Sequence, residues 1–302
     1  MPTFNLDSLD FEDDEETRFG ADDHFAARFS SGNTRFELED LTNSAVGYIP
    51  QNISTDLIGG KFAETVSEGK ALADDGNVYD TIQAAQDAAS SWVKVGPGDF
   101  RESVTIDTAG LTLEGSGERT KVKFAGNDRK IYVNNNNITV NSFSIENSSS
   151  NSSVVYVDPA GSNTTLSNLS VNGTDQSGIQ CNGFDSLIIN CTVSNASPRC
   201  INADAEQNIV TQCYVSDGES GINIGESDSI VSFNVVENSQ DEGINSFDDS
   251  IIIGNMIQNT DSFGILIGSA DANSIIANNR LVNTAGIDDD GTGTELDGNL
   301  VT

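Results

Sequence analysis

The chain has 302 residues, and its 47 acidic side chains against 14 basic ones give a formal charge of −33 and an isoelectric point of about 4.1. This charge excludes a protein that binds nucleic acid through a basic surface, because polyanion binding needs clustered lysine and arginine. The 36% of apolar residues and the 28 glycines together come close to the usual globular share of roughly 45–50%. The chain can therefore form a hydrophobic core.

The acidity favours a protein that works at high salt. Acidic residues outnumber basic ones in every region, and only six of the 14 basic residues are lysine. In dilute buffer such a charge pushes a compact chain apart, whereas at 1 M salt the screening length falls to about 3 Å. We therefore predict a halophilic source, with an ordinary acidic protein as the alternative.

Residues 1–75 form the first predicted region, and we expect it to be an N-terminal docking or assembly arm. It has no repeat, and its acidic run at residues 10–16 is typical of a solvated segment. Its aromatic residues are too many for a linker, which suggests docking on another copy or another protein: Phe4, Phe11, Phe19, Phe25, Phe29, Phe36 and Tyr48. We expect neither a conventional secretory signal nor a membrane-spanning segment.

A short helix is expected at residues 80–90, at the start of the second region, 76–302. Asp80 is the predicted N-cap and Gln83 its capping-box partner. Ile82, Ala85 and Ala89 form one narrow apolar face. Such a helix is expected to cover an open sheet edge.

A repeat begins at residue 178. Its units start at Gly178-Ile179, Cys200-Ile201, Gly221-Ile222, Gly243-Ile244, Gly264-Ile265 and Gly286-Ile287, with spacings of 22, 21, 22, 21 and 22 residues. A second apolar patch follows about nine residues later in each unit, as in Leu187-Ile188-Ile189. After it comes a small or amide residue: Cys191, Cys213, Asn234, Asn255, Asn279 and Asn299.

This repeat predicts an all-β fold, a single-stranded right-handed parallel β-helix with about 21–22 residues per coil. The period is too short for a helical hairpin, and the β-branched residues at alternate positions suit strands. Leucine-rich repeats share the period, but their LxxLxL runs are missing. Coils stacked at about 4.8 Å would align the isoleucines into one buried row and the amides into a second row that lines a turn. Looser coils are expected earlier, around Phe143, Ile145, Leu169 and Val171.

The start of this region resembles a known group of proteins. The matching segments are Asp80-Thr-Ile-Gln-Ala-Ala, the stretch from Trp92 to Ile106, and Leu111-Thr-Leu-Glu-Gly-Ser-Gly117 with Thr120. They resemble the pectin-lyase-like superfamily of right-handed β-helices, pectin methylesterases in particular. The later coils resemble the repeats of that superfamily and of viral tailspikes. The resemblance covers residues 76–302 and implies a fold rather than a reaction.

The known active-site motifs of that superfamily are missing. The only histidine is His24, outside the repeat, and neither the Arg-Ile-Lys motif of polygalacturonases nor the Gln-Asp-Thr motif of pectin methylesterases occurs. The lyases of this fold commonly use a basic residue beside calcium, whereas after Lys130 this chain has only Arg199 and Arg280. We interpret both arginines as surface or interface charges. We assign no catalytic and no cofactor-binding residue.

Several residues stay open as candidates. Stacked coils could present a pair of carboxylates for glycoside hydrolysis, from Asp204, Asp228, Asp248, Asp249 and Asp271. Three tyrosines could stack on a sugar or simply pack: Tyr132, Tyr156 and Tyr214. Trp92 is interpreted as a core residue rather than a sugar platform.

Two further clusters concern metals and thiols. The acids of the last coil could hold Ca²⁺ or Na⁺, although their spacing is not that of an EF-hand: Asp288, Asp289, Asp290, Glu295 and Asp297. The four cysteines lack zinc-site spacing and are expected to be core thiols of undetermined redox state: Cys181, Cys191, Cys200 and Cys213.

The function expected from this sequence is that of a structural or adhesive virion protein of a halophilic virus, tailspike-like or a capsid-vertex spike. We expect a homo-oligomer, with a trimer favoured, because the last coil ends at an apolar position with no cap. Other virion proteins and a host surface glycan or glycoprotein are the expected partners. The alternatives are a polysaccharide-degrading enzyme and a non-viral, sugar-binding surface β-helix.

Overall fold

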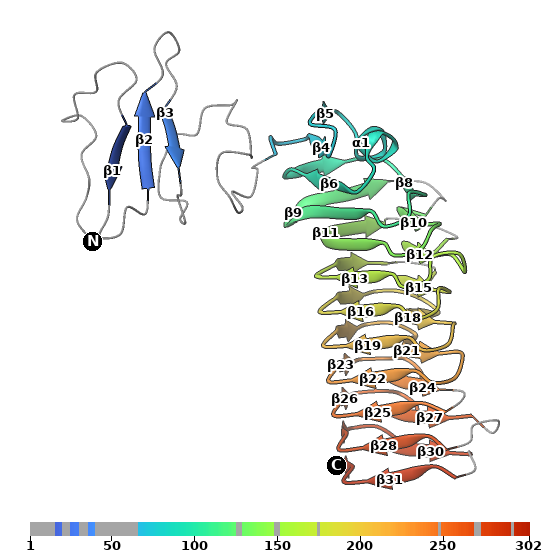
Figure 1. Ribbon diagram of the computed structural model, residues 1–302. Coiled ribbons are helices and arrows are strands. Elements are labelled where there is room, and N and C mark those ends of the chain that lie inside the picture. Colours follow the sequence, from blue (N-terminus) through green and yellow to red (C-terminus); the bar gives the residue numbers. More distant parts are fainter. Residues whose placement is uncertain are drawn as a thin grey trace. The chain divides into compact units, whose positions relative to one another are not determined.

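The computed structural model describes residues 16–19, 25–29, 36–39, 66–124, 129–147, 152–173, 176–246, 249–268, 273–290 and 293–302. The chain divides into two compact units, Met1–Thr65 and Val66–Thr302. In the first unit, β1 (Glu16–Phe19), β2 (Phe25–Phe29) and β3 (Phe36–Glu39) form an antiparallel sheet in that order (Figure 1). His24 and most of the acidic run at residues 10–16 lie outside the described residues.

The second unit is a parallel β-helix of stacked coils (Figure 1). One strand of each coil joins a nine-stranded parallel sheet. Its members are β8 (Val104–Ile106), β10 (Ile131–Val133), β12 (Val155–Val157), β15 (Ile179–Cys181), β18 (Arg199–Ala203), β21 (Ser220–Ile224), β24 (Ile244–Ser246), β27 (Ile265–Ile267) and β30 (Ile287–Asp289). The predicted all-β fold is therefore confirmed.

The other two strands of each coil form two adjacent rows. The first row holds β6 (Trp92–Val95), the first parts of β9 (Thr112–Phe124) and β11 (Thr139–Asn147), β13 (Thr165–Ser167), β16 (Leu187–Ile189), β19 (Ile209–Thr211), β22 (Ile230–Ser232), β25 (Ile251–Ile253), β28 (Ile275–Ala277) and β31 (Glu295–Asp297). The second row holds β7 (Gly98–Phe100), the last parts of β9 and β11, β14 (Ser170–Asn172), β17 (Thr192–Ser194), β20 (Tyr214–Ser216), β23 (Val235–Glu237), β26 (Met256–Gln258), β29 (Arg280–Val282) and β32 (Leu300–Val301).

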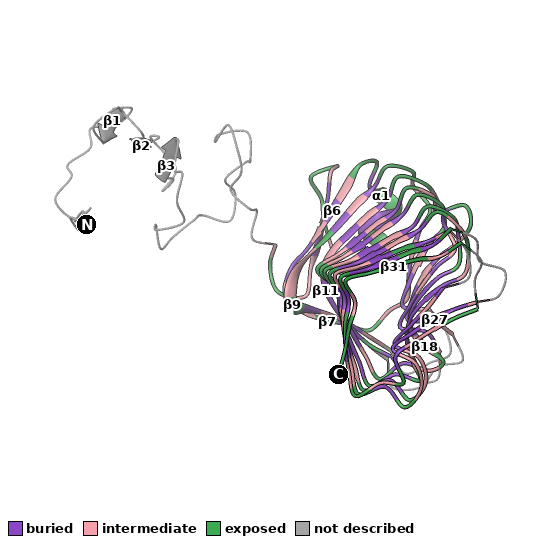
Figure 2. Ribbon diagram, turned by 90° about the horizontal axis from the view of Figure 1, so that it is seen from below, coloured by how far each residue is buried: buried purple, intermediate pink, exposed green. Residues whose placement is uncertain are grey.

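The coils bend at residues with left-handed backbone conformation. The coil that starts at β15 bends at Asp185, Asn190 and Asn195, with φ values of 54°, 53° and 54°. Asparagine and aspartate adopt this conformation more easily than other non-glycine residues. Part of the asparagine and aspartate content therefore has a local cause, which is the bends of the coils (Figure 2).

The predicted isoleucine row is confirmed. Ile179, Ile201, Ile222, Ile244, Ile265 and Ile287 pair in register through consecutive strands of the nine-stranded sheet. The first five are completely buried, and Ile287 is half-buried in the last coil. Each buried aliphatic side chain of this size contributes roughly 1.5–3 kcal/mol, so this row is a main source of stability.

The glycines that precede these isoleucines mark a close approach inside the coil. A Cβ atom on Gly221 would meet the Val236 side chain and the Gly243 carbonyl group. The second strand row therefore packs directly on this position. Cys200 takes the place of glycine in one coil, and there Gly218 leaves room for the Cys200 sulfur.

The predicted amide row is confirmed as well. The Asn255 Oδ1 accepts hydrogen bonds from the backbone N–H of Asn234 at 2.9 Å and from its Nδ2 at 3.0 Å. The Asn255 Nδ2 donates to the Val231 carbonyl at 2.9 Å and to the Asn279 Oδ1 at 3.0 Å. The same links join Asn279 to Asn299. Each amide side chain thus forms hydrogen bonds with backbone groups at the bend between the two strand rows, where no strand supplies a partner.

The first end of the coil stack is closed by α1 (Ile82–Ala88), β4 (Ala71–Ala73) and β5 (Val78–Tyr79). The strand β4 pairs antiparallel with both β5 and β6, so the compact unit begins at Val66, ahead of the boundary at residue 76 expected from sequence. Ile82 and Ala85 are completely buried beneath α1, as its apolar face predicts.

The capping of α1 differs from the prediction. Its N-cap is Thr81, whose side chain accepts from the Ala84 N–H at 3.1 Å, while Asp80 pairs with Lys70 instead. Gln83, the predicted capping-box partner, bonds to the sheet instead. Its Oε1 accepts from the Thr105 N–H at 2.7 Å, and its Nε2 donates to the Thr105 carbonyl at 3.2 Å. Gln83 thus pairs with β8 as a further strand would.

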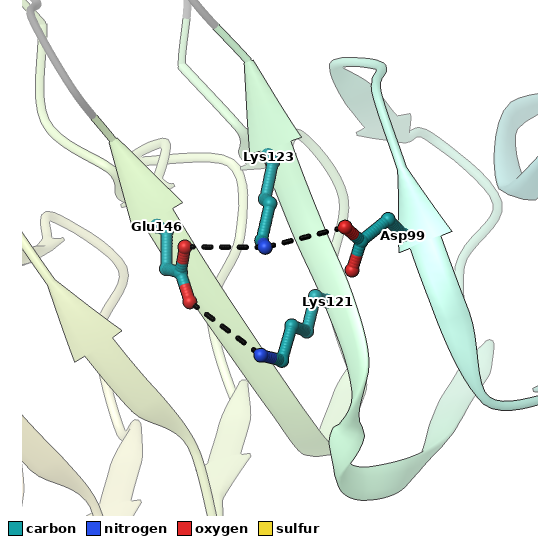
Figure 3. A network of polar contacts seen from close by, with 4 residues as sticks. All are labelled: Asp99, Lys121, Lys123 and Glu146. Carbon is teal, nitrogen blue, oxygen red and sulfur yellow. Dashed lines mark hydrogen bonds and ion pairs between the residues drawn. The ribbon is translucent and has the colours of Figure 1, made fainter.

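Four charged residues form a network on the outside of the first coils (Figure 3). Lys123 lies 3.3 Å from Asp99 and 3.5 Å from Glu146, and Lys121 lies 4.0 Å from Glu146. All four side chains are partly exposed, so each pair contributes at most about 1 kcal/mol. The network matters chiefly because it gathers lysines, which the later coils lack.

Replacing Ile222 with Asp should prevent folding of the β-helix. The carboxylate would be buried between Ile201 and Ile244, which removes apolar contacts worth about 2–5 kcal/mol and adds the larger cost of an unpaired charge. Circular dichroism at molar salt measures the loss of β structure. The control is Ile251→Asp, because Ile251 is 36% exposed. A folded Ile222→Asp protein would show that the register is wrong.

Replacing Asn255 with Ala should lower the free energy of unfolding by about 2–5 kcal/mol. The Asn234 N–H and the Val231 carbonyl would both lose their partner, and each unpaired buried group costs about 1–3 kcal/mol. Urea unfolding measures this change. Asn172→Ala is the matched control because Asn172 is exposed on β14, and its unfolding midpoint should stay within error of the wild type. Equal midpoints for both variants would contradict a structural role of the amide row.

Candidate binding face

The outer face of the nine-stranded sheet carries a row of polar side chains. Side chains alternate along a strand, and in all of these strands except β30 the residues on either side of the central position, such as Ile131 and Val133, are buried. The central residues therefore face outward. In coil order they are Thr105, Tyr132, Tyr156, Gln180, Asn202, Asn223, Asn245, Leu266 and Asp288. We call this row the outer row.

An aromatic and cationic cluster occupies the first part of the outer row. The Tyr132 and Tyr156 rings lie 5.7 Å apart, and the Arg129 guanidinium lies 3.6 Å from the Tyr156 ring centre and 4.9 Å from that of Tyr132. The Tyr132 hydroxyl donates to Asp158 at 2.9 Å, and this bond raises the pKa of the phenol. Arg129 thus covers one face of Tyr156 and holds a cation beside two hydroxyls.

Amides take over in the middle of the outer row. The Asn182 Nδ2 donates to the Tyr156 hydroxyl at 2.9 Å, and the Ser153 hydroxyl donates to the Gln180 Oε1 at 2.8 Å. These contacts tie the aromatic cluster to the next coil. Gln180 and Asn182 are only partly buried, so their remaining donors and acceptors can reach a ligand.

The next two coils carry a pair of asparagines at the centre of the face. The Asn223 Nδ2 donates to the Asn202 Oδ1 at 2.7 Å, and the Asn202 Nδ2 donates to the Asp204 Oδ2 at 2.6 Å. Asn202 and Asn223 are 2% and 1% exposed, although they point away from the core. The two asparagines and Asp204 therefore form an ordered, hydrogen-bonded polar layer at the centre of this face.

Carboxylates lie along this face. Asp158 and Asp204 follow their strands at equivalent positions two coils apart, which at about 4.8 Å per coil places them about 10 Å from each other. Glu242, which stands before β24 rather than in the outer row, accepts from the Ser220 hydroxyl at 3.4 Å, and burial raises its pKa. The face combines hydroxyls, amides, carboxylates and one stacked cation, which is suited to binding a ligand with many hydroxyl groups.

The structure places only some of the candidate residues on this face. Tyr132, Tyr156 and Asp204 lie on it, whereas Tyr214 lies on β20 and donates to Glu237 at 2.8 Å. Asp228 and Asp249 occupy bends with φ of 59° and 26°, so neither joins Asp204. Asp248 and Asp271 lie outside the described residues.

The basic and tryptophan candidates are spread over several strands. Arg199 starts β18, and Arg280 starts β29 on another side of the coil. Within the described ranges, no carboxylate lies within 4.0 Å of either guanidinium. Trp92 is half-buried on β6, with the Lys94 ammonium 5.4 Å from its ring centre.

The metal and thiol candidates give no reactive centre among the described residues. There, no three His, Cys, Asp or Glu side chains gather closely enough to hold a metal ion. In the last coil, the Thr294 hydroxyl donates to Asp289 at 3.0 Å. The four cysteines are free and buried, and burial raises the pKa of Cys200 to about 11, so it stays protonated at neutral pH.

Sequence reasoning missed Arg129, Asn202 and Asn223. For the two asparagines a signal is present, because each stands between two core residues of its strand, one residue after the repeated isoleucine. Arg129 precedes a strand whose repeat is irregular in sequence, and only the stacking of β10 on β12 brings it to Tyr156.

Comparison with known proteins agrees with the parallel β-helix fold that the structure shows. Residues 153–301 match the family described as "Right handed beta helix region". No curated protein is similar enough in sequence to count as a relative. The resemblance to the right-handed β-helix superfamily is thus confirmed at the level of fold.

In the part of the chain described here, no helix is long and apolar enough to cross a membrane.

Solved structures with this fold come from different functional groups. The catalytic domain of Agl-KA is 15% identical, with a TM-score of 0.57, over 78% of this chain and 54% of that one. The α-1,3-glucanase of Streptomyces thermodiastaticus is 14% identical, with a TM-score of 0.56, over 79% and 56%. The Dettilon tailspike protein is 17% identical, with a TM-score of 0.55, over 69% and 48%. This chain spans about half the length of these proteins, and the likeness shows the fold alone.

Replacing Asp158 with Asn should lower the pKa of Tyr132 towards its ordinary value of about 10. The carboxylate stabilises the protonated phenol by accepting its hydrogen bond, and a neutral amide does so less. Ultraviolet titration of tyrosine ionisation measures the change, with Tyr132→Phe identifying the signal. The raised pKa of Tyr214, which Glu237 causes, should stay unchanged. An unaltered titration curve would contradict the Tyr132–Asp158 contact.

Proposed function

We propose that this protein is an adhesive β-helix of a virion, tailspike-like or a capsid-vertex spike, that binds a host-surface glycan along the outer row. The observation that carries the proposal is the outer row itself. Hydroxyl, amide and carboxylate groups follow one another there at the spacing of the coils, next to the Arg129–Tyr156 stack. A chain of sugar units presents its hydroxyls at regular intervals and matches such a surface.

The virion assignment is supported by the similarity to tailspike proteins. Besides the Dettilon protein, the tailspike protein 2 of bacteriophage CAB120 has a TM-score of 0.55 over 72% of this chain. We propose that residues 1–75 dock on other virion proteins and that the β-helix forms a homo-oligomer, with a trimer favoured. The charge of −33 supports work at high salt, where screening removes the repulsion between like chains.

A glycan-cleaving enzyme is the second candidate. The similarity to an α-1,3-glucanase supports it, and so does the placement of Asp158 and Asp204 on one face. Inverting glycosidases hold their two carboxyl groups about 6.5–9.5 Å apart, and the separation of about 10 Å expected for two coils is close to that range. A non-viral, sugar-binding surface protein is the third possibility, and it shares the same binding face.

The test is binding to a panel of immobilised neutral, amino and uronate oligosaccharides, measured with the full chain at molar salt. We expect Tyr156→Ala to lower the affinity for the bound glycans about tenfold, because stacking and cation–π contacts are each worth about 0.5–1.5 kcal/mol. Tyr214→Ala is the matched control, since Tyr214 is 40% exposed on β20, and it should bind like the wild type. Equal loss in both variants, or no binding at all, would overturn the proposed function.

The same incubations separate adhesion from catalysis. An adhesive protein leaves the glycan intact, whereas an enzyme produces new reducing ends. New reducing ends that disappear with Asp158→Asn or Asp204→Asn would favour the enzyme. Electron microscopy of the parent particle tests the virion assignment, and a monomeric protein without any particle association would contradict it.

A further inference from the structure

The outer face of the first strand row carries a line of aliphatic side chains. In the strands β16, β19, β22, β25 and β28 the central residue is buried, so the first residue of each strand points outward. These first residues pair in register from coil to coil (Figure 1): Leu187, Ile209, Ile230, Ile251 and Ile275. We call these five residues the aliphatic stripe. Ile251 and Ile275 are 36% and 39% exposed.

No charged residue occupies an outward position in the described strands of this row from β13 to β28. The outward positions besides the stripe hold only threonine, serine, isoleucine and alanine. Charged residues return beyond these strands, at Glu114 on β9 and at Glu295 and Asp297 on β31. The chain has 47 acidic residues, so a charge-free apolar face of this length points to a protein contact.

Phe233, at the bend after β22, is a second sign of a contact. Its φ of 55° lies in the left-handed region, which costs a bulky side chain more than asparagine or glycine. A Cβ atom on Gly254 would meet the Phe233 ring, so the ring lies on this glycine, yet it stays 62% exposed. The equivalent bends hold only amide residues or glycine: Asn168, Asn190, Gln212, Gly254 and Asn278. Phe233 thus gains little burial from the described residues, whereas an apolar partner would bury it.

The distribution of charge favours another copy of this chain as the partner. Two copies of charge −33 bring acids opposite each other over most contacts, and like charges face to face are unfavourable. Two aliphatic stripes can meet without opposing charges. Acids border the face only at the bend before each strand, at Asp185, Asp228 and Asp249, where molar salt screens them.

The size of the face sets how far the contact extends. Six strands stacked at about 4.8 Å, each about 10 Å long, offer about 300 Å², whereas a stable interface buries about 800 Å² on each partner. The contact must therefore include the bend at Phe233 and part of the second strand row. Val235 and Met256 lie there in register, half-buried, and continue the apolar surface.

We infer that copies of this protein pack side by side through the aliphatic stripe, with Phe233 buried at the edge of the contact. This inference rests on the homo-oligomer of the proposed function and names its contact surface. The outer row belongs to the nine-stranded sheet, on a separate side of the coil (Figure 2). The contact therefore does not use the proposed glycan-binding face.

The variant Ile251→Asp tests the contact because it places a charge in the stripe at a position that is already partly exposed. We expect light scattering at molar salt to show the mass of the monomer, 31.9 kDa, in place of the oligomer mass of the wild type. Circular dichroism should stay unchanged. Asn172→Asp is the matched control, since Asn172 is exposed on β14 outside the stripe, and it should keep the oligomer mass.

The variant Phe233→Asn separates a contact role from a folding role. Asparagine adopts the left-handed conformation more easily than phenylalanine, so the fold measured by circular dichroism should be kept. We expect the dissociation constant of the oligomer to rise about tenfold, because aromatic side chains supply much of the binding energy of an interface. An unchanged dissociation constant would remove Phe233 from the contact and overturn the inference in this form.

Two further outcomes would overturn the contact surface. One is a wild-type chain that is monomeric at molar salt, and the other is an unchanged oligomer mass in Ile251→Asp, which would leave the stripe to residues 1–65 or to another protein. Glycan binding is measured separately on the same samples. Binding that is kept in Ile251→Asp and lost in Tyr156→Ala would leave the glycan-binding function standing in either case. Absence of glycan binding together with a monomeric Ile251→Asp would overturn that function and leave the contact surface standing.

Discussion

The in-register stacking of parallel coils is the constraint on which everything else in the described β-helix depends. Because each coil returns to the same position about 4.8 Å further along the axis, every residue type in one coil meets its equivalent in the next. Apolar residues then form continuous rows, and the row from Ile179 to Ile287 fixes the register of the nine-stranded sheet. A shift of one residue would turn that row outward.

The same stacking determines which polar side chains of neighbouring coils can form hydrogen bonds with one another. Inside the bend between the two strand rows, stacked asparagines satisfy one another and the backbone, so a buried polar file is stable. On the outside of the nine-stranded sheet, the outer row changes from tyrosines to amides. Only some neighbouring amides of this row, such as Asn202 and Asn223, are joined by hydrogen bonds among the described residues. One geometry therefore produces a continuous hydrogen-bonded ladder on one side and a row of polar side chains with fewer mutual hydrogen bonds on the other.

The stacked coils also give some of the acidic residues specific structural roles. Aspartates supply several of the left-handed bends, such as Asp185 and Asp217, where a short polar side chain lowers the conformational cost. Lysines are gathered in the first coils, where Lys121 and Lys123 pair with Asp99 and Glu146. Part of the charge thus serves the backbone, part coats the surface, and a smaller part flanks the outer row.

The sequence by itself determined the parallel β-helix, its period, the isoleucine row and the amide row, because a strict repeat of 21–22 residues specifies which residues stack. It also pointed to Tyr132, Tyr156 and Asp204. Only the tertiary structure decided that Thr81 rather than Asp80 caps α1, that Arg129 stacks on Tyr156, and that Asn223 bonds to Asn202 across neighbouring coils. These features depend on contacts between coils and on side-chain direction, which no spacing along a single chain encodes.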